Sequence, residues 1–109
     1  MAEPMPAPIE AYFAAKKNND VEGMAAQFGE NAVVKDEGHT YQGRAAIKQW
    51  KTTASTKYRY TCEPFACARE GGRFVVTSRL TGNFPGSPID LRFFFELECD
   101  KITSLEIIP

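Results

Sequence analysis

The 109-residue chain has little of several features that would point directly to a function. One histidine and three cysteines form no cluster with metal-ligand spacing, so we expect no metal site and reduced thiols. No apolar run exceeds five residues, which is far too short for a membrane span. Thirteen basic and fourteen acidic residues leave a net charge of −1, which lacks the positive field that non-specific nucleic-acid binding requires. These absences argue against metal, membrane and nucleic acid as partners.

The chain also lacks a nucleotide-phosphate loop and other cofactor motifs, so we expect any chemistry to be cofactor-free. No basic segment followed by an apolar one comes after Met1, which predicts a cytoplasmic protein without a secretory signal. The length suits one domain over residues 1–109, and 43% hydrophobic residues suffice for a core. Pro4, Pro6 and Pro8 predict that residues 1–8 form a loose arm.

Helical spacing dominates the first half of the sequence. Ile9, Tyr12, Phe13 and Lys16 recur at i, i+3, i+4 and i+7, which predicts a helix with Ile9, Tyr12 and Phe13 facing inward. A second helix is predicted over residues 21–28, ended by Gly29. After two short strands over 32–36 and 39–42, joined through Glu37 and Gly38, a third helix places Ala46, Ile47 and Trp50 on its inner side.

The second half reads as sheet. We predict strands over residues 58–69, 74–81, 89–98 and 102–108, where Pro64 requires an edge position or a bulge in the first. Alternation along 89–98 places Phe93 and Phe95 on one face, and Asp90 and Phe94 on the other. Cys62 and Cys67, five positions apart on a regular strand, point to opposite faces and are not expected to bridge. The element order predicts an α+β fold with helices on one face of a curved sheet, a shape that leaves a cavity between its layers.

Five segments resemble the nuclear transport factor two-like superfamily, in its SnoaL-like and ketosteroid isomerase-like branch. They are IEAYFAA (9–15), NDVEGM (19–24), VVKDEG (33–38), YQGRAAI (41–47) and KITSLEI (101–107). The resemblance covers the chain from end to end. It implies a cone-shaped fold in which three N-terminal helices pack on a strongly curved, mainly antiparallel sheet and enclose a deep apolar pocket. It also implies a homodimer through the outer face of the sheet. Because the superfamily contains both enzymes and binding proteins, it does not by itself fix an activity.

Two residues match the chemical positions of ketosteroid isomerases. These enzymes carry a tyrosine on the first helix as oxyanion donor and an aspartate ending the first strand as general base, which here correspond to Tyr12 and Asp36. A carboxylate beside an apolar cavity can remove a proton α to a carbonyl, while a phenol hydrogen-bonds the enolate. The family's third member, a protonated aspartic acid, is not matched: Asp90 is on the outward face, and Phe93 occupies the inward position.

Each of these residues has a structural alternative. Asp36 is either the pocket base or a turn residue that bonds its own downstream backbone. Tyr12 is either a ligand contact or a packed helix aromatic. His39, close to Asp36 across the turn, is either part of an Asp-His pair for ester or epoxide hydrolysis or a solvated strand residue. A cysteine-histidine nucleophile has nothing in the sequence to orient it.

The expected pocket is lined by Val34, His39, Trp50, Phe93 and Phe95. Two functions remain open at this point. One is a small-molecule-binding SnoaL-like protein that acts as an isomerase, cyclase or lyase on an apolar carbonyl compound, with Asp36 and Tyr12 as catalytic residues. The other is a non-catalytic dimeric module that binds a ligand or scaffolds an interaction. In either case we expect a small apolar ligand and a homodimer in which Phe94, with Phe65 or Phe74, forms the contact.

Overall fold

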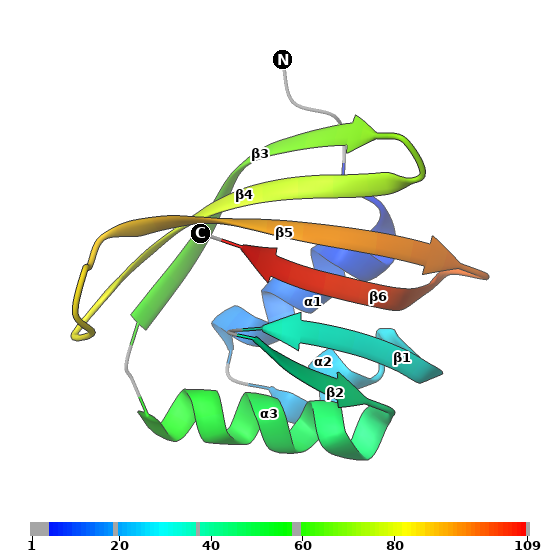
Figure 1. Ribbon diagram of the computed structural model, residues 1–109, viewed down its shortest axis with the longest axis horizontal. Coiled ribbons are helices and arrows are strands. Elements are labelled where there is room, and N and C mark those ends of the chain that lie inside the picture. The colour runs from blue at the N-terminus through cyan, green and yellow to red at the C-terminus, as the bar shows by residue number, and fades with distance from the viewer. Residues whose placement is uncertain (1–4, 19, 37, 58–59, 109) are drawn as a thin grey trace.

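A computed structural model shows three helices and six strands (Figure 1). It describes residues 5–18, 20–36, 38–57 and 60–108, with the backbone alone for 53–57. The elements follow one another along the chain as α1 (Ala7–Lys17), α2 (Val21–Ala25), β1 (Phe28–Asp36), β2 (His39–Gln42), α3 (Arg44–Lys57), β3 (Tyr60–Glu70), β4 (Arg73–Gly82), β5 (Ile89–Glu98) and β6 (Lys101–Ile108). This is the predicted α+β fold class, with the helices toward the N-terminus.

The six strands form one sheet in the order β2-β1-β6-β5-β4-β3. All neighbouring strands are antiparallel except β1 and β6, which run parallel. Asp36 at the end of β1 is therefore opposite Ile107 near the end of β6. In Figure 1, α1 lies behind the sheet and α3 runs beside the β1–β2 end. The helices thus cover a single face of the sheet.

The inner face of the sheet and the helices share one core. Ile9, Tyr12 and Phe13 of α1 are buried against Phe93 and Phe95 of β5, as the helical and strand periodicities predicted. The rings meet mostly edge to face, with Phe13 and Phe93 centred 5.2 Å apart. Such packing combines apolar burial with favourable ring electrostatics. It fixes α1 firmly over β5.

The start of β1 differs from the prediction. Residues 26–28 were expected to continue the second helix, but α2 ends at Ala25 and β1 begins at Phe28. Phe28 is fully buried and pairs with Ile102 of β6, so parallel strand pairing outweighs the helical spacing of Phe28 with Met24. A parallel partner from the far end of the chain leaves no local signal in the sequence.

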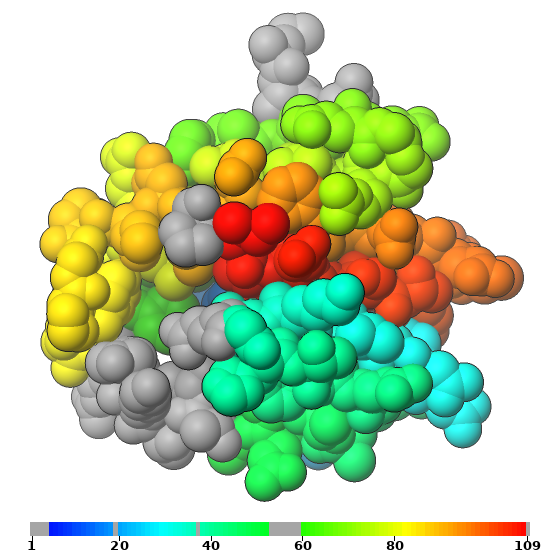
Figure 2. All heavy atoms as spheres, viewed as in Figure 1, coloured from blue at the N-terminus to red at the C-terminus, as the bar shows by residue number. Residues whose placement is uncertain are grey.

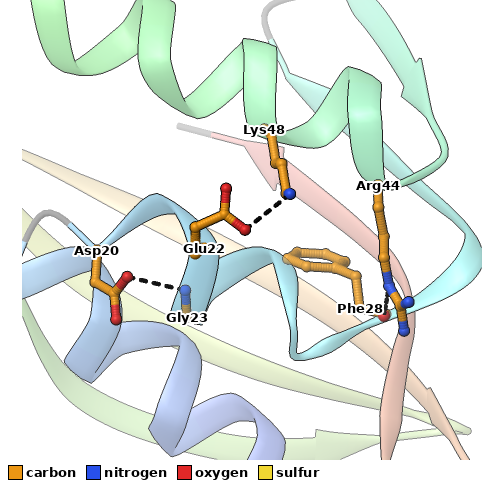
Figure 3. A network of polar contacts seen from close by, with 6 residues as sticks. All are labelled: Asp20, Glu22, Gly23, Phe28, Arg44 and Lys48. Atoms are coloured by element: carbon orange, nitrogen blue, oxygen red, sulfur yellow. Dashed lines mark hydrogen bonds and ion pairs between the residues drawn. The ribbon is translucent and has the colours of Figure 1, made fainter.

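A network of polar contacts joins α2, α3 and β1 (Figure 3). The Asp20 side chain caps α2 by accepting a hydrogen bond from the Gly23 N–H at 3.0 Å. Lys48 of α3 forms an ion pair with Glu22 at 2.8 Å. Arg44 Nε, also on α3, donates to the Phe28 carbonyl at 2.9 Å. These contacts hold the first half of α3 against the N-terminal elements.

Strand β3 is both an edge strand and bulged, the two ways of accommodating Pro64 that the sequence predicted. The register with β4 shifts between Pro64 and Ala66. This bulge resets the alternation, so both Cys62 and Cys67 pack against the core. The opposite-face argument for these two residues is therefore wrong, although both thiols are free as expected.

Further observations concern the start of α1, the β1–β2 hairpin and Phe74. Helix α1 begins at Ala7, so Pro8 is buried in its first turn, and only residues 1–4 of the predicted arm lie outside the described part. In the β1–β2 hairpin, Gly38 has a φ of +76°, while Glu37 lies outside the described residues. Phe74 shares the inward alternation of Val76 and packs against the core. Its expected place in an outer-face contact is wrong.

Candidate functional site

Asp36 lies at the end of β1 on the strand side that faces the helices. Ala32 and Val34 on the same side are buried. The indole Nε1–H of Trp50, from α3, donates a hydrogen bond to Asp36 Oδ2 at 3.0 Å. The half-buried carboxylate is therefore held toward the inner side of α3.

Tyr12 has an unusual environment for a tyrosine. It is completely buried, with its ring centre 5.8 Å from that of Phe28 and 5.5 Å from that of Phe95. Its hydroxyl has no hydrogen-bond partner among the described residues. Burial raises the Tyr12 pKa well above its usual value, and nearby groups that include Asp36 raise it further. The phenol is thus protonated at neutral pH, with a donor to offer to a ligand.

Two lysines face the same interior. Lys16 Nζ lies 4.7 Å from the ring centre of Phe93 and 5.7 Å from the ring centres of Tyr12 and Tyr60. Lys51 of α3 is only 4% exposed, and its Nζ lies 5.7 Å from the same Tyr60 ring. The ion pairs that the structure shows between described residues use other basic side chains. The two amines therefore contact aromatic rings instead of carboxylates.

This environment weakens the proton affinity of both amines. Burial lowers the Lys16 pKa, an effect that Cys62 and Asp36 oppose. Burial, together with the charge of Lys16, lowers the Lys51 pKa to about 8, against a smaller opposing effect of Cys62. Burial raises the pKa of Tyr60 to about 12, which keeps that phenol neutral between the amines. The interior is therefore electropositive at neutral pH and becomes less so as the pH rises through 8.

One more polar group is buried in the core without a partner. Ser78 of β4 is completely buried between Val76 and Leu80 on the inward face, and its Oγ has no hydrogen bond among the described residues. A buried hydroxyl without a partner costs stability unless a ligand or water satisfies it. Ser78 and Tyr12 thus leave two such groups in one core.

Sequence periodicity carried a signal for these groups that we did not use. Lys16 is seven positions after Ile9, and Lys51 is four after Ile47, so both lysines lie on the apolar sides of their helices. Ser78 takes an inward position in strand alternation. Tyr60 and Cys62 became recognisable only once the bulged β3 was placed beside the helices.

Asp36 also reaches the outside of the molecule. A groove of about 300 Å³ is lined by Lys35, Asp36, Gly38, His39, Thr40, Glu106 and Ile107. His39 is exposed and opposite Asp36 in the β1–β2 register, with its ring 6.4 Å from that of Tyr41. The structure thus places His39 in an outer groove and away from the buried walls. Figure 2 shows a hollow between the yellow β4–β5 connection and the end of β1, with blue atoms of α1 at its bottom.

The other predicted wall residues are buried together. Val34, Phe93 and Phe95 are fully buried, and Trp50 nearly so. Phe93 and Phe95 are stacked with ring centres 6.4 Å apart, and Phe93 carries the Lys16 amine on its face. Asp90, in contrast, is exposed and bonded to Arg79 Nε at 3.0 Å on the outer face, as predicted. The inner site therefore has one carboxylate from the predicted set, Asp36.

Within the described ranges, no three histidine, cysteine or acidic side chains gather as metal ligands would. No helix in the same part of the chain has the length and apolar character of a membrane span.

Known proteins share this architecture and, in part, the sequence. A polyketide-cyclase candidate from Sinorhizobium meliloti superposes with a TM-score of 0.91 at 35% identity, covering 94% of both chains. A protein with a ketosteroid isomerase-like fold from Catenulispora acidiphila, solved in complex with trimethylamine, superposes with a TM-score of 0.84 at 18% identity. The alignment covers 97% of this chain and 87% of that one. Another polyketide-cyclase candidate, from Xanthomonas campestris, superposes with a TM-score of 0.79 at 20% identity, covering 92% of this chain and 85% of that one.

Among curated protein sequences, none matches the chain. The family model of the SnoaL-like domain matches residues 9–105, which include β1 to β5, the first part of β6 and most of α1. The resemblance read from the five sequence segments is thereby confirmed. This protein belongs to the SnoaL-like domain family.

Proposed function

We propose that the protein binds a small enolisable carbonyl compound between α1, α3 and the sheet and acts on it without a cofactor, as an isomerase, cyclase or lyase. The observation that carries this proposal is the buried Tyr12 hydroxyl, which lacks a partner among the described residues in an interior that also feels the charge of Asp36. The candidate polyketide-cyclase function of the Sinorhizobium relative is consistent with carbonyl chemistry.

Each residue has a role that its environment supports. Asp36 accepts the proton from the carbon next to the carbonyl, and the electron pair of that C–H bond forms the enolate. Tyr12 donates a hydrogen bond to the enolate oxygen in a region without bulk water, where such a bond is strong. The Trp50 indole N–H orients the carboxylate. Return of the proton to another carbon completes an isomerisation. In a cyclisation the enolate carbon attacks a second carbonyl carbon, and the oxygen of that carbonyl takes the proton from Asp36.

The test is exchange of the α protons of 2-tetralone in D₂O, followed by NMR against the rate in buffer. Asp36→Asn removes the base and should lower the rate ~10²-fold or more. Tyr12→Phe should lower it by about one to two factors of ten. Asp90→Asn is the matched control, since this outer-face carboxylate is bonded to Arg79.

A wild-type rate equal to that of buffer or of Asp36→Asn would contradict the catalytic proposal. The protein would then be a binding module of the same fold. In that case Asp36→Asn and Tyr12→Phe should keep ligand affinity within a few-fold.

We also propose a homodimer through the outer face of the sheet. Phe65 is 54% exposed on β3, under the guanidinium of Arg79 at 5.5 Å. Phe94 is half-buried on β5, with Arg73 and Arg92 at 4.9 and 5.6 Å from its ring centre. An isologous contact would bury these aromatics. Light scattering at micromolar concentration should give the mass of a dimer, and Phe65→Glu should give a monomer, whereas a wild-type monomer would refute this proposal.

A further inference from the structure

We propose that the substrate or ligand of this interior carries a carboxylate, which binds between Lys16 and Lys51 while its apolar part packs against the buried aromatic rings. The inference rests on the proposed function for the location of the site and adds the chemical class of the molecule. It starts from the two lysines, which none of the predicted roles uses.

The geometry places both amines beside one ring. Lys16 Nζ and Lys51 Nζ are each 5.7 Å from the centre of Tyr60, although one comes from α1 and the other from α3. The charge of Lys16 also acts on Lys51, and in the proposed site one anion lies between these two amines from separate helices. A carboxylate has two oxygens and can accept from both.

The cost of this arrangement also points to an anion. Two like charges near each other in a poorly hydrated region repel, and each loses solvation on burial. Lys51 is 4% exposed, and no carboxylate or carbonyl of the described residues accepts a hydrogen bond from its amine. Aromatic contacts offset part of the lost solvation but leave the N–H donors without oxygen acceptors. A bound carboxylate supplies those acceptors and the missing negative charge.

The surrounding groups fit an acid with an apolar body. Phe93 is fully buried beneath the Lys16 amine, and Tyr12 adjoins it with an unpartnered hydroxyl. Asp36 accepts a hydrogen bond from Trp50, and its negative charge opposes the lowering of the Lys16 pKa, so it offsets only part of the positive charge of this interior. The interior thus combines two cations, hydroxyl donors and aromatic walls. A neutral hydrocarbon would use only the walls.

The test compares three carboxylates with their primary amides by isothermal titration calorimetry: benzoate, octanoate and 2-naphthoate. Each amide has nearly the shape of its acid without the charge. We expect at least one acid to bind about tenfold or more tightly than its amide, because charge-assisted hydrogen bonds replace neutral ones. Lys51→Met and Lys16→Met should each bring that ratio close to one through loss of carboxylate affinity, with amide affinity unchanged.

Two variants serve as matched controls. Lys17→Met removes the exposed lysine next to Lys16 on α1, and Lys48→Met removes a lysine one turn before Lys51 on α3. Both should keep the preference for the acid. If Lys51→Met does not fold, the half-buried Lys16→Met still tests the site, and Lys51→Arg, which keeps the charge, should retain the preference.

The inference is overturned if no acid of the series binds more tightly than its amide, or if the control variants lose the preference as fully as Lys16→Met. Its failure is distinct from that of the proposed function. Carboxylate preference without proton exchange by the wild type refutes only the catalytic role. Proton exchange without carboxylate preference refutes only the anion site.

Discussion

Charged residues on the two faces of the sheet have different surroundings. On the outer face, Arg79 is bonded to Asp90 at 3.0 Å and Arg73 lies 3.7 Å from Glu106, all of them largely in contact with water. On the inner face, Lys16 and Lys51 lie against aromatic rings, and the ion pairs between described residues include neither amine. Water and a counter-charge make the outer pairs nearly neutral for stability, whereas on the inner face Lys51 is almost fully buried and Lys16 is half-buried.

This difference indicates where function is located. A fold gains nothing from an unpaired buried ammonium or an unpartnered hydroxyl, because both cost solvation. The inner face carries both kinds of group, in Lys51 and in Tyr12 and Ser78. Stability alone does not account for them, whereas the proposed polar ligand would supply their missing partners.

The largest expected contrast concerns aromatic residues on the two faces. Phe93→Ala should lower the free energy of unfolding by about 3–5 kcal/mol, because Phe93 is fully buried between Phe13 and Phe95. Phe65→Ala on the outer face should change it by only ~0.5 kcal/mol in the monomer. Urea unfolding measures both. A loss for Phe65→Ala that grows with protein concentration would report the proposed dimer, and equal losses at low concentration would refute the contrast.

Removing the buried Lys51 amine should stabilise the fold, in contrast to the loss expected for Phe93→Ala. Lys51→Met should raise the free energy of unfolding at pH 7 by about 1–3 kcal/mol in the absence of ligand, because the folded chain no longer holds that charge out of water. Lys48→Met, which breaks an exposed ion pair with Glu22, should lower it by at most ~0.5 kcal/mol. Destabilisation by Lys51→Met would show that the amine is satisfied in the fold.

The lowered pKa of Lys51 also predicts that the free energy of unfolding depends on pH. Its pKa is about 8 in the folded chain against 10.5 when exposed, so the unfolded chain binds more protons between these values. Stability due to Lys51 should therefore rise with pH from about 8 to 10, and the advantage of Lys51→Met should shrink over that range. Lys16 acts in the same direction, while the raised pKa values of Tyr12 and Tyr60 matter only above 10. Denaturant titrations from pH 7 to 10 measure this trend, and a constant Lys51→Met advantage would contradict it.

A smaller difference in stability is expected between the alanine variants of Ser78 and Ser87. Ser78→Ala should leave stability unchanged or raise it by up to about 1 kcal/mol, because its Oγ has no partner among the described residues. Ser87→Ala should lower it by about 0.5–1 kcal/mol, because Ser87 Oγ accepts a hydrogen bond from the Gly82 N–H at 2.9 Å. Thermal unfolding of the two variants compares them directly. The reverse order would mean that Ser78 is already satisfied without ligand.

The smallest effect is expected for the outer ion pair. Asp90→Asn should cost ~0.2–1 kcal/mol at low salt and less at about 1 M salt, where exposed charges are screened. Thermal unfolding at two salt concentrations measures this. A cost that persists at high salt would mean that the outer face is buried, as in the proposed dimer.

Most element types, the inward faces of α1 and β5, and the family could be predicted from the sequence, whereas residues 26–28 were wrongly expected to be helical. These features depend on periodicity and on short segments of neighbouring residues, which any fold of this chain must respect. Strand alternation also correctly predicted that Asp90 faces outward and Phe93 inward. Pro64 forecast an edge position or a bulge because proline lacks the N–H that an inner strand requires.

Contacts between polar residues from distant segments could not be predicted, because they depend on the folded arrangement. Lys16, Lys51 and Tyr60 are separated by many residues along the chain, and their approach depends on how α1 and α3 pack over a bulged β3. The hydrogen bond from Trp50 to Asp36 likewise joins two elements whose spacing no local pattern encodes. Phe28 entered a strand because β6, from the far end of the chain, pairs with it. Burial of a charge depends on all the groups around it, so the proposed site at the two lysines could be recognised only in the folded chain.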